Sequence, residues 1–185
     1  LRAAGVVIFG RTTSPEGGIG PATEAAVYGG PTRNPWDLAR TPGGSSGGAG
    51  AAVAAGIVPA AHGSDGGGSV RIPASNCGLF GFKATRARFP DGPYAGEGWG
   101  GMAIDGFLTR SVRDAAALMD AAEGADLGAP YWAPPLRHGY MAAIARPPHR
   151  LRVGLCDTAF DGRPVHPDCA EAARDAARLL ESLGH

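Results

Sequence analysis

The sequence has 185 residues, 44% of them hydrophobic, and its 17 basic residues balance its 17 acidic residues. This length suffices for one domain with a buried core, and the hydrophobic content excludes an intrinsically disordered chain. A chain without net charge has no electrostatic attraction for nucleic acid or for an anionic membrane. We therefore expect a globular protein that binds neither.

The cysteine and histidine residues show no disulfide or metal pattern. The three cysteines lie far apart without a C-x-x-C pair, which favours a reducing compartment and a cytoplasmic location. The five histidines are scattered without paired spacing, so we expect no metal and no cofactor. A membrane span needs about 18 consecutive apolar residues, and no apolar run in the sequence is that long. No signal-peptide pattern is visible.

The first part of the chain alternates short apolar segments with glycine-rich ones. Residues 5–10 (GVVIFG) predict a buried strand, and residues 57–61 predict a second one. Residues 11–44 are rich in proline, glycine, threonine and asparagine, and a loop of this length is usually functional. The small apolar residues 49–55 predict a helix that packs closely against its neighbours.

The middle of the chain has one strong helix signal. From Lys83 to Gly101 the sequence predicts irregular structure. Ser111 followed by Asp114 has the capping-box pattern that begins a helix, and the apolar residues after it recur on one face.

The C-terminal part predicts a separate strand and helix. Residues 126–150 are a proline-rich connection, residues 151–155 predict a strand, and Pro167 suits the first position of a long helix. We therefore divide one domain into a core over residues 1–125, this connection, and a strand–helix unit over residues 151–185. Alternating strands and helices indicate an α/β fold.

Both ends of the chain have features of an interrupted sequence. The sequence begins with Leu1 instead of methionine. At the other end, the last predicted helix ends at Gly184, one residue before the end of the sequence. We expect the chain to be part of a longer domain, truncated at its N-terminus.

Two serine- and glycine-rich segments, residues 41–48 and 63–74, carry the candidate chemistry. Three successive glycines allow several backbone N–H groups to turn toward one point and to hold an anion there. Ser69, directly after Gly66–Gly68, is well placed to attack a carbonyl group whose oxygen those N–H groups bind.

Three other interpretations compete with this one. Residues 43–47 match the G-x-S-x-G nucleophile elbow, but no strand pattern precedes them. Residues 96–101 match the dinucleotide-binding G-x-G-x-x-G, but again without a preceding strand and with Trp99 inside the motif. Flexible surface loops would also be glycine-rich, although two such segments around an apolar helix and strand disfavour that explanation.

Both segments resemble the signature of the amidase-signature family, which includes bacterial amidases, fatty-acid amide hydrolases and the A subunit of glutamyl-tRNA amidotransferase. Residues 43–48 (GGSSGG) are similar to the family's G-G-S-S-G-G segment, and residues 65–74 (DGGGSVRIPA) to its D-x-G-G-S-[IV]-R-x-P-[AS] segment. Ser69 follows Ser45 by 24 residues, as the two catalytic serines do in the family. The likeness extends over nearly the whole chain, with further similar segments at residues 10–16 and 78–85.

The resemblance implies the family's α/β fold, with a mixed central sheet flanked by helices and incomplete at both ends of this chain. It also implies a triad of two serines and a lysine. Ser69 would be the acylated nucleophile, and Ser45, after a cis peptide bond from Gly44, would pass its proton to a neutral lysine. The two hydroxyl groups should then lie about 2.6–3.2 Å apart. The oxyanion hole would consist of the backbone N–H groups of Gly66, Gly67, Gly68 and Ser69.

The family's catalytic lysine lies upstream of the first serine, outside this chain. Lys83 is the single lysine of the sequence and matches a structural lysine of the family. Arg11 stands where many members have lysine, but arginine cannot accept a proton. We therefore expect this chain alone to be inactive.

Three residues, Ser46, Asp65 and Arg71, are expected to support the site. Asp65 and Arg71 flank the nucleophile and favour a buried pair that holds the oxyanion loop, with an ordinary surface ion pair as the alternative. Cys77 and His62 lie near the nucleophile in sequence. We expect the first to be a small core residue and the second a packed histidine with a satisfied ring rather than a general base.

The sequence thus predicts an amidase that hydrolyses a linear or cyclic carboxamide through an acyl-enzyme. The expected partner is a small-molecule amide, and a homodimer remains open. One alternative is the A subunit of a tRNA-dependent amidotransferase, although the proline-rich residues 131–135 and 146–148 favour a free-standing amidase. The other is an inactive binding protein that has kept the fold.

Overall fold

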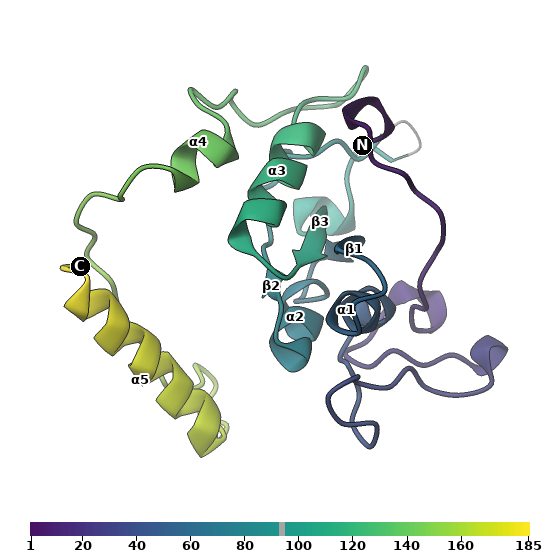
Figure 1. The fold of residues 1–185 in the computed structure, drawn as a ribbon, viewed down its shortest axis with the longest axis horizontal. Helices are drawn as coiled ribbons and strands as arrows, with labels where there is room; N and C mark the ends of the chain where they lie inside the picture. Colours follow the sequence, from purple (N-terminus) through teal and green to yellow (C-terminus); the bar gives the residue numbers. More distant parts are fainter. Residues whose placement is uncertain (93–94) are drawn as a thin grey trace. The chain divides into compact units, whose positions relative to one another are not determined.

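The computed structural model describes residues 1–92 and 95–185. It divides into two compact units, Leu1–Ala145 and Arg146–His185. Each unit is described by itself (Figure 1).

The described residues of the first unit form a small sheet, four α-helices and several single turns of 3₁₀ helix. Its strands are β1 (Ala60–Asp65), β2 (Phe80–Gly81) and β3 (Ile104–Thr109). Its α-helices are α1 (Gly47–Ala54), α2 (Arg71–Cys77), α3 (Val112–Ala122) and α4 (Tyr140–Ile144). Its 3₁₀ turns are Arg2–Ala4, Glu16–Gly18, Ala26–Tyr28 and Trp99–Gly101.

The sheet has the order β1-β3-β2, and both pairings are antiparallel. The central strand β3 pairs Ile104 with Asp65 at the end of β1, and Thr109 with Phe80 in β2. The chain leaves the sheet at Asp65 and returns at Phe80, so the glycine loop and α2 fill the connection between the two edge strands. The expected α/β fold is confirmed, and the sheet of the described residues is small and antiparallel.

The sheet buries a different set of side chains on each face. Leu108 points toward α1 and α2 and packs with Ala49, Val70 and Ala74. The adjacent Phe107 points to the opposite face, because side chains alternate along a strand. There it forms a second cluster with Met119 of α3, Ile104 at the start of β3, and Ala84 and Phe89 from the segment between β2 and β3. Helices therefore cover both faces of the sheet, as Figure 1 shows.

Helix α1 packs as closely as its small residues predicted. A side chain at Gly48 would place its Cβ 2.4 Å from the main-chain oxygen of Thr13, and one at Gly50 would approach Pro73 to 3.1 Å. Only residues without side chains let the backbone of α1 come this close to its neighbours. The helix thereby brings residues 13, 42–46 and 73 into one packed region.

The helix predicted from Ser111 is also confirmed. The Ser111 hydroxyl oxygen accepts a hydrogen bond from the Asp114 N–H at 3.0 Å, which satisfies one of the free N–H groups of the first turn. Helix α3 then buries Ala115, Ala116 and Met119 against the sheet.

Two predicted strands are wrong. Residues 5–10 and 151–155 are extended but belong to no sheet of the described chain. Val7 and Phe9 are 81% and 74% exposed, and the apolar side chains of residues 151–155 are about half exposed. Apolar residues alone do not make a strand, because its N–H and C=O groups also need a neighbouring strand.

Other elements differ from the sequence prediction in position. Strand β1 begins at Ala60 rather than at Ile57, which is 69% exposed. Strand β3 and helix α2 were not predicted at all. Asp105 and Gly106 interrupt the apolar pattern of the strand, and Pro73 disfavoured a helix although its first turn tolerates proline.

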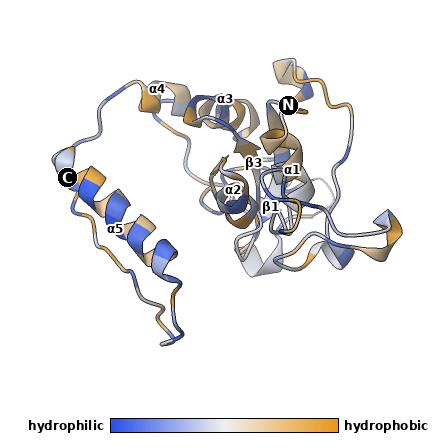
Figure 2. Ribbon diagram, turned by 60° about the horizontal axis from the view of Figure 1, so that its bottom comes forward, coloured by the Kyte–Doolittle hydropathy of each residue, from blue (hydrophilic) through white to orange (hydrophobic). Residues whose placement is uncertain are grey.

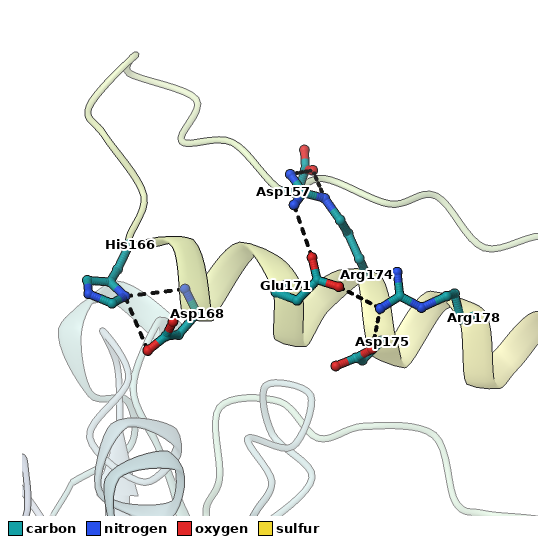
Figure 3. A network of polar contacts seen from close by, with 7 residues as sticks. All are labelled: Asp157, His166, Asp168, Glu171, Arg174, Asp175 and Arg178. Carbon is teal, nitrogen blue, oxygen red and sulfur yellow. Dashed lines mark hydrogen bonds and ion pairs between the residues drawn. The ribbon is translucent and has the colours of Figure 1, made fainter.

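The second unit consists of extended residues followed by α5 (Pro167–Ser182), the helix predicted from Pro167. Figure 2 shows hydrophilic and hydrophobic residues interspersed along α5, as in an amphipathic helix. Its charged residues form a network with Asp157 (Figure 3). Arg174 contacts Asp157 at 2.7 Å and Glu171 at 3.2 Å, and Glu171 also contacts Arg178 at 2.6 Å.

Within the described residues, no helix combines the length and the apolar composition needed to cross a membrane. The same residues contain no cluster of three or more histidine, cysteine or acidic side chains arranged to hold a metal ion.

Candidate active site

Ser69 lies in the turn between the glycine loop and α2. The loop leaves β1 at Asp65, and Gly68 has φ of 128°, a conformation open to glycine and strained for other residues. The Ile72 N–H then donates to the Gly68 carbonyl at 2.6 Å and closes the turn that leads into α2. Ser69 is half-buried at the end of this loop.

Ser45 lies in the turn before α1 and is 6% exposed. The Gly44–Ser45 peptide bond is cis, as the resemblance implied. The next residue joins this turn to the loop that carries Ser69, because the Ser46 N–H donates to the Ser69 carbonyl at 3.1 Å. The two serines, 24 residues apart in sequence, are therefore adjacent in the fold.

The Ser46 side chain holds the turn against β1. Its hydroxyl accepts from the Ser64 N–H at 3.3 Å and lies 3.4 Å from the Ser64 carbonyl oxygen. A Cβ at Gly63 would come within 2.5 Å of this hydroxyl, so a larger residue there would displace Ser46. Ser46 therefore contacts both β1 and, through its N–H, the residue expected to be the nucleophile.

One expected contact is not formed. Among the described residues, the hydroxyl groups of Ser45 and Ser69 make no direct hydrogen bond, although their loops are joined by the Ser46 N–H. The main chain sets the distance between the two loops, whereas the hydroxyl groups turn about their own χ1 angles. The structure therefore brings the two residues together without pairing their side chains.

The glycine loop offers fewer free donors than the sequence predicted. The Gly68 N–H, which the sequence analysis expected in an oxyanion hole, donates to the Asp65 carboxylate at 2.7 Å and so already has an acceptor. The N–H groups of Gly66, Gly67 and Ser69 have no acceptor in the described part of the chain. Space around Gly67 is open, because a Cβ there would meet no atom within 4 Å.

The Asp65 side chain binds the main chain of this loop. Its buried carboxylate accepts the N–H groups of Gly68, Val70 and Arg71 at 2.7–3.1 Å. The Arg71 guanidinium binds the same carboxylate through two nitrogen atoms, at 2.8 and 3.0 Å. This is the ion pair expected from the sequence. Its Asp65 side chain is buried, whereas the Arg71 side chain is half exposed.

These contacts decide the ionisation of Asp65. Burial by itself raises the pKa of the carboxyl group, but the hydrogen bonds from the Arg71 side chain and from the N–H groups of Arg71, Val70 and Gly68 outweigh it. The pKa of Asp65 falls to about 2. The carboxylate therefore stays charged at neutral pH and keeps the loop in one conformation.

Thr23 is a residue of the site that the sequence analysis missed. It is 1% exposed, its hydroxyl donates to the Gly43 carbonyl at 2.8 Å, and the same oxygen accepts the Gly47 N–H at 3.0 Å. It thus contacts the turn on both sides of Ser45. No signal marked it, because Thr23 is one polar residue in a long loop without periodicity.

The remaining candidate residues are not part of this site. His62 is on the opposite face of β1 from Asp65, where its ring contacts Asp105 at 3.3 Å and Phe107. Cys77 is fully buried, as expected of a core residue, with its thiol 3.7 Å from the Pro42 carbonyl oxygen. Within the described residues, neither Lys83 nor Arg11 forms a hydrogen bond or ion pair with the two serines.

Known proteins have similar sequences. The chain is 48% identical to the 6-aminohexanoate-cyclic-dimer hydrolase of Paenarthrobacter ureafaciens over 188 aligned residues. It is 49% identical over 187 residues to the protein named putative amidase AmiB2 of Mycobacterium tuberculosis (strain ATCC 25618 / H37Rv). Each alignment covers 100% of this chain and 38% of the relative, so the chain spans about two fifths of their length.

Solved structures match as well. A structure of 6-aminohexanoate cyclic dimer hydrolase superposes with a TM-score of 0.94 and 48% identity, covering 100% of this chain and 38% of that one. A bacterial aryl acylamidase of the amidase-signature family superposes with a TM-score of 0.83 and 37% identity, covering 92% and 34%. The amidase family model matches residues 1–185. Because the match includes every residue of both serine segments, this chain belongs to the amidase family, that of the amidase-signature enzymes.

Proposed function

We propose that the protein hydrolyses the C–N bond of a carboxamide through an acyl-enzyme on Ser69. The observation that carries this proposal is the hydrogen bond from the Ser46 N–H to the Ser69 carbonyl, at 3.1 Å. It holds two serine loops side by side, next to backbone N–H groups that have no acceptor among the described residues. A nucleophile, a proton relay and an oxyanion site need this proximity.

The proposed reaction begins with attack by the Ser69 oxygen on the amide carbon. As the new C–O bond forms, the electron pair of the C=O bond moves to the carbonyl oxygen, which the N–H groups of Gly66, Gly67 and Ser69 would bind. The Ser69 proton passes to the Ser45 oxygen, and the Ser45 proton passes to the base. When the C=O bond re-forms, the C–N bond breaks and the amine leaves with a proton from the base. Water then repeats these steps on the ester and releases the acid.

The base in this scheme is a neutral lysine outside this chain. Lys83 is the single lysine of the sequence and lies beyond both serine loops. A lysine amine with a lowered pKa removes a serine proton well near neutral pH. This chain by itself is then expected to be inactive.

The proposed substrates are small linear or cyclic amides. The relative with 48% identity is named for hydrolysis of the cyclic dimer of 6-aminohexanoate, and the AmiB2 protein is named a putative amidase. The first name describes hydrolysis of a cyclic dimer, and the second describes cleavage of an amide. No residue of the described site holds a metal or a cofactor in this scheme.

The test is covalent labelling of the intact protein with a fluorophosphonate. The Ser69 oxygen forms a bond to phosphorus, fluoride leaves, and the serine proton passes to the base. We expect one label on Ser69, found by peptide mass spectrometry, and none in Ser69→Ala. The matched control is Ser75→Ala, because Ser75 is an exposed serine on α2 and should not affect labelling. Unchanged labelling of Ser69→Ala would refute the proposal.

A further inference from the structure

We propose that Thr23 is a positioning residue for the proton transfer between Ser45 and Ser69. This inference rests on the acyl-enzyme chemistry proposed above and assigns a role to a residue outside both serine segments. Its basis is one buried hydroxyl group that contacts the main chain before and after Ser45.

The Thr23 hydroxyl has both a donor and an acceptor role. It donates to the Gly43 carbonyl at 2.8 Å, with the Ser45 carbonyl oxygen 3.5 Å away, and it accepts the Gly47 N–H at 3.0 Å. A hydroxyl group can fill both roles at once, whereas a methyl group of the same size can fill neither. The hydroxyl therefore closes the turn that carries Ser45.

The surrounding main chain leaves little room for the turn to move. A Cβ at Gly47 would meet the Thr23 hydroxyl at 2.2 Å, and one at Gly44 would meet the Gly20 carbonyl oxygen at 2.7 Å. Thr23 is itself anchored, because its carbonyl accepts the Thr32 N–H at 2.9 Å. The loop before the turn is therefore a packed support rather than a free connection.

The turn held by Thr23 is the one that meets the nucleophile loop. The Ser46 N–H donates to the Ser69 carbonyl, so a shift of the turn changes the position of the Ser45 hydroxyl relative to Ser69. Such a shift slows proton transfer, which depends on the distance between the two oxygen atoms. It leaves the binding of a reagent to the open side of the glycine loop unchanged.

The experiment measures phosphonylation of Ser69 by a fluorophosphonate in the intact protein. In this step the O–P bond forms, fluoride leaves, and the Ser69 proton passes through Ser45 to the base. Thr23→Val removes the hydroxyl and keeps the shape, whereas Thr23→Ser keeps the hydroxyl and removes a methyl group. We expect Thr23→Val to lower the maximal inactivation rate about 10- to 100-fold with an unchanged half-saturating concentration. We expect Thr23→Ser to stay within about threefold of wild type.

The matched control is Thr109→Val. Thr109 at the end of β3 is also fully buried, and its hydroxyl also donates to a carbonyl at 2.8 Å, that of Ser111. Its loss should lower stability much as Thr23→Val does and leave the inactivation rate unchanged. A thermal melt of each variant separates the effect on folding from the effect on the rate.

Each outcome decides the inference. A Thr23→Val rate equal to that of wild type, or an equal loss in Thr109→Val, refutes it while Ser69 labelling still supports the proposed function. If Thr23→Val does not fold, Thr23→Ala takes its place, and equal rates in Thr23→Ala and Thr23→Ser refute the role of the hydroxyl. If wild type is not labelled at Ser69, the proposed function fails and this inference fails with it.

Discussion

The carboxylate of Asp65 and the guanidinium of Arg71 join the two ends of the loop that carries Ser69. Two nitrogen atoms of Arg71 lie 2.8 and 3.0 Å from the two carboxylate oxygens, and Asp65 is 1% exposed. Asp65 ends β1 and Arg71 begins α2, so this contact closes the segment that contains Ser69. The same carboxylate accepts three backbone N–H groups from that segment, which fixes its path.

Replacing Asp65 with asparagine should therefore destabilise the protein. Asparagine is neutral and offers one oxygen instead of two, so it cannot satisfy Arg71 and the loop N–H groups together. We expect the free energy of unfolding to fall by about 2–3 kcal/mol, measured by urea denaturation. The matched control is Asp37→Asn, which removes the charge from an exposed pair with Arg40, 3.0 Å apart. A surface pair contributes little, so equal losses in the two variants would contradict this interpretation.

Acid should remove the same stabilisation. Because the pKa of Asp65 is lowered from 3.8 to about 2, the folded state binds this proton less readily than the unfolded state does. The contribution, about 2 kcal/mol, is fully present above about pH 4 and is lost as the pH falls toward 2. Urea denaturation at pH 5, 3 and 2 should show this loss in wild type and a smaller one in Asp65→Asn. Parallel curves for the two proteins would show that other groups cause the acid sensitivity.

Two neighbouring glycines should respond differently to alanine. Gly68 has φ of 128°, and a Cβ there would approach Ile72 Cδ1 to 2.8 Å. Gly68→Ala should lower the free energy of unfolding by about 1–3 kcal/mol. Gly67→Ala adds its methyl group to open space and should leave stability unchanged. Thermal melts of both variants provide the comparison, and equal melting temperatures would contradict the strained geometry at Gly68.

The pH dependence of activity tests the nature of the base. If a neutral amine accepts the proton, the rate should rise toward alkaline pH and level off, without a step near the histidine pKa of about 6.5. His62→Gln should have the same profile, because His62 lies on the opposite face of β1 and contacts Asp105. A step near neutral pH that disappears in His62→Gln would identify His62 as the base instead.

The cysteines should differ in reactivity toward iodoacetamide. Cys77 is fully buried, and burial raises the pKa of its thiol, so little reactive thiolate forms. Cys156 and Cys169 are exposed and should react first. Mass spectrometry of the folded protein should find both modified and Cys77 intact, whereas Cys77 should react once urea unfolds the chain. Early modification of Cys77 would mean that its site opens in the native state.

Much of the candidate site could be predicted from the sequence because its residues lie in two short, characteristic segments. Glycines and serines at fixed spacing predicted the turn at Ser45 and the loop at Ser69. The Asp65–Arg71 pair was also predicted, since the two residues are six positions apart and flank one loop. Helices α3 and α5 were predicted for a similar reason, because their caps and apolar faces are local patterns.

The sequence by itself therefore determined the family, the local turns and the helices whose signals lie within a few residues. Only the tertiary structure decided which extended segments became strands, because residues 5–10 and 151–155 have the apolar pattern but pair with no strand of the described chain. The tertiary structure also decided which hydrogen-bond partner each polar group has. Asp65 takes the N–H of Gly68 that the oxyanion hole was expected to use, and Thr23 contacts the turn around Ser45 from more than twenty residues away. Hydrogen bonds between distant segments depend on how the chain packs, and no local pattern records them.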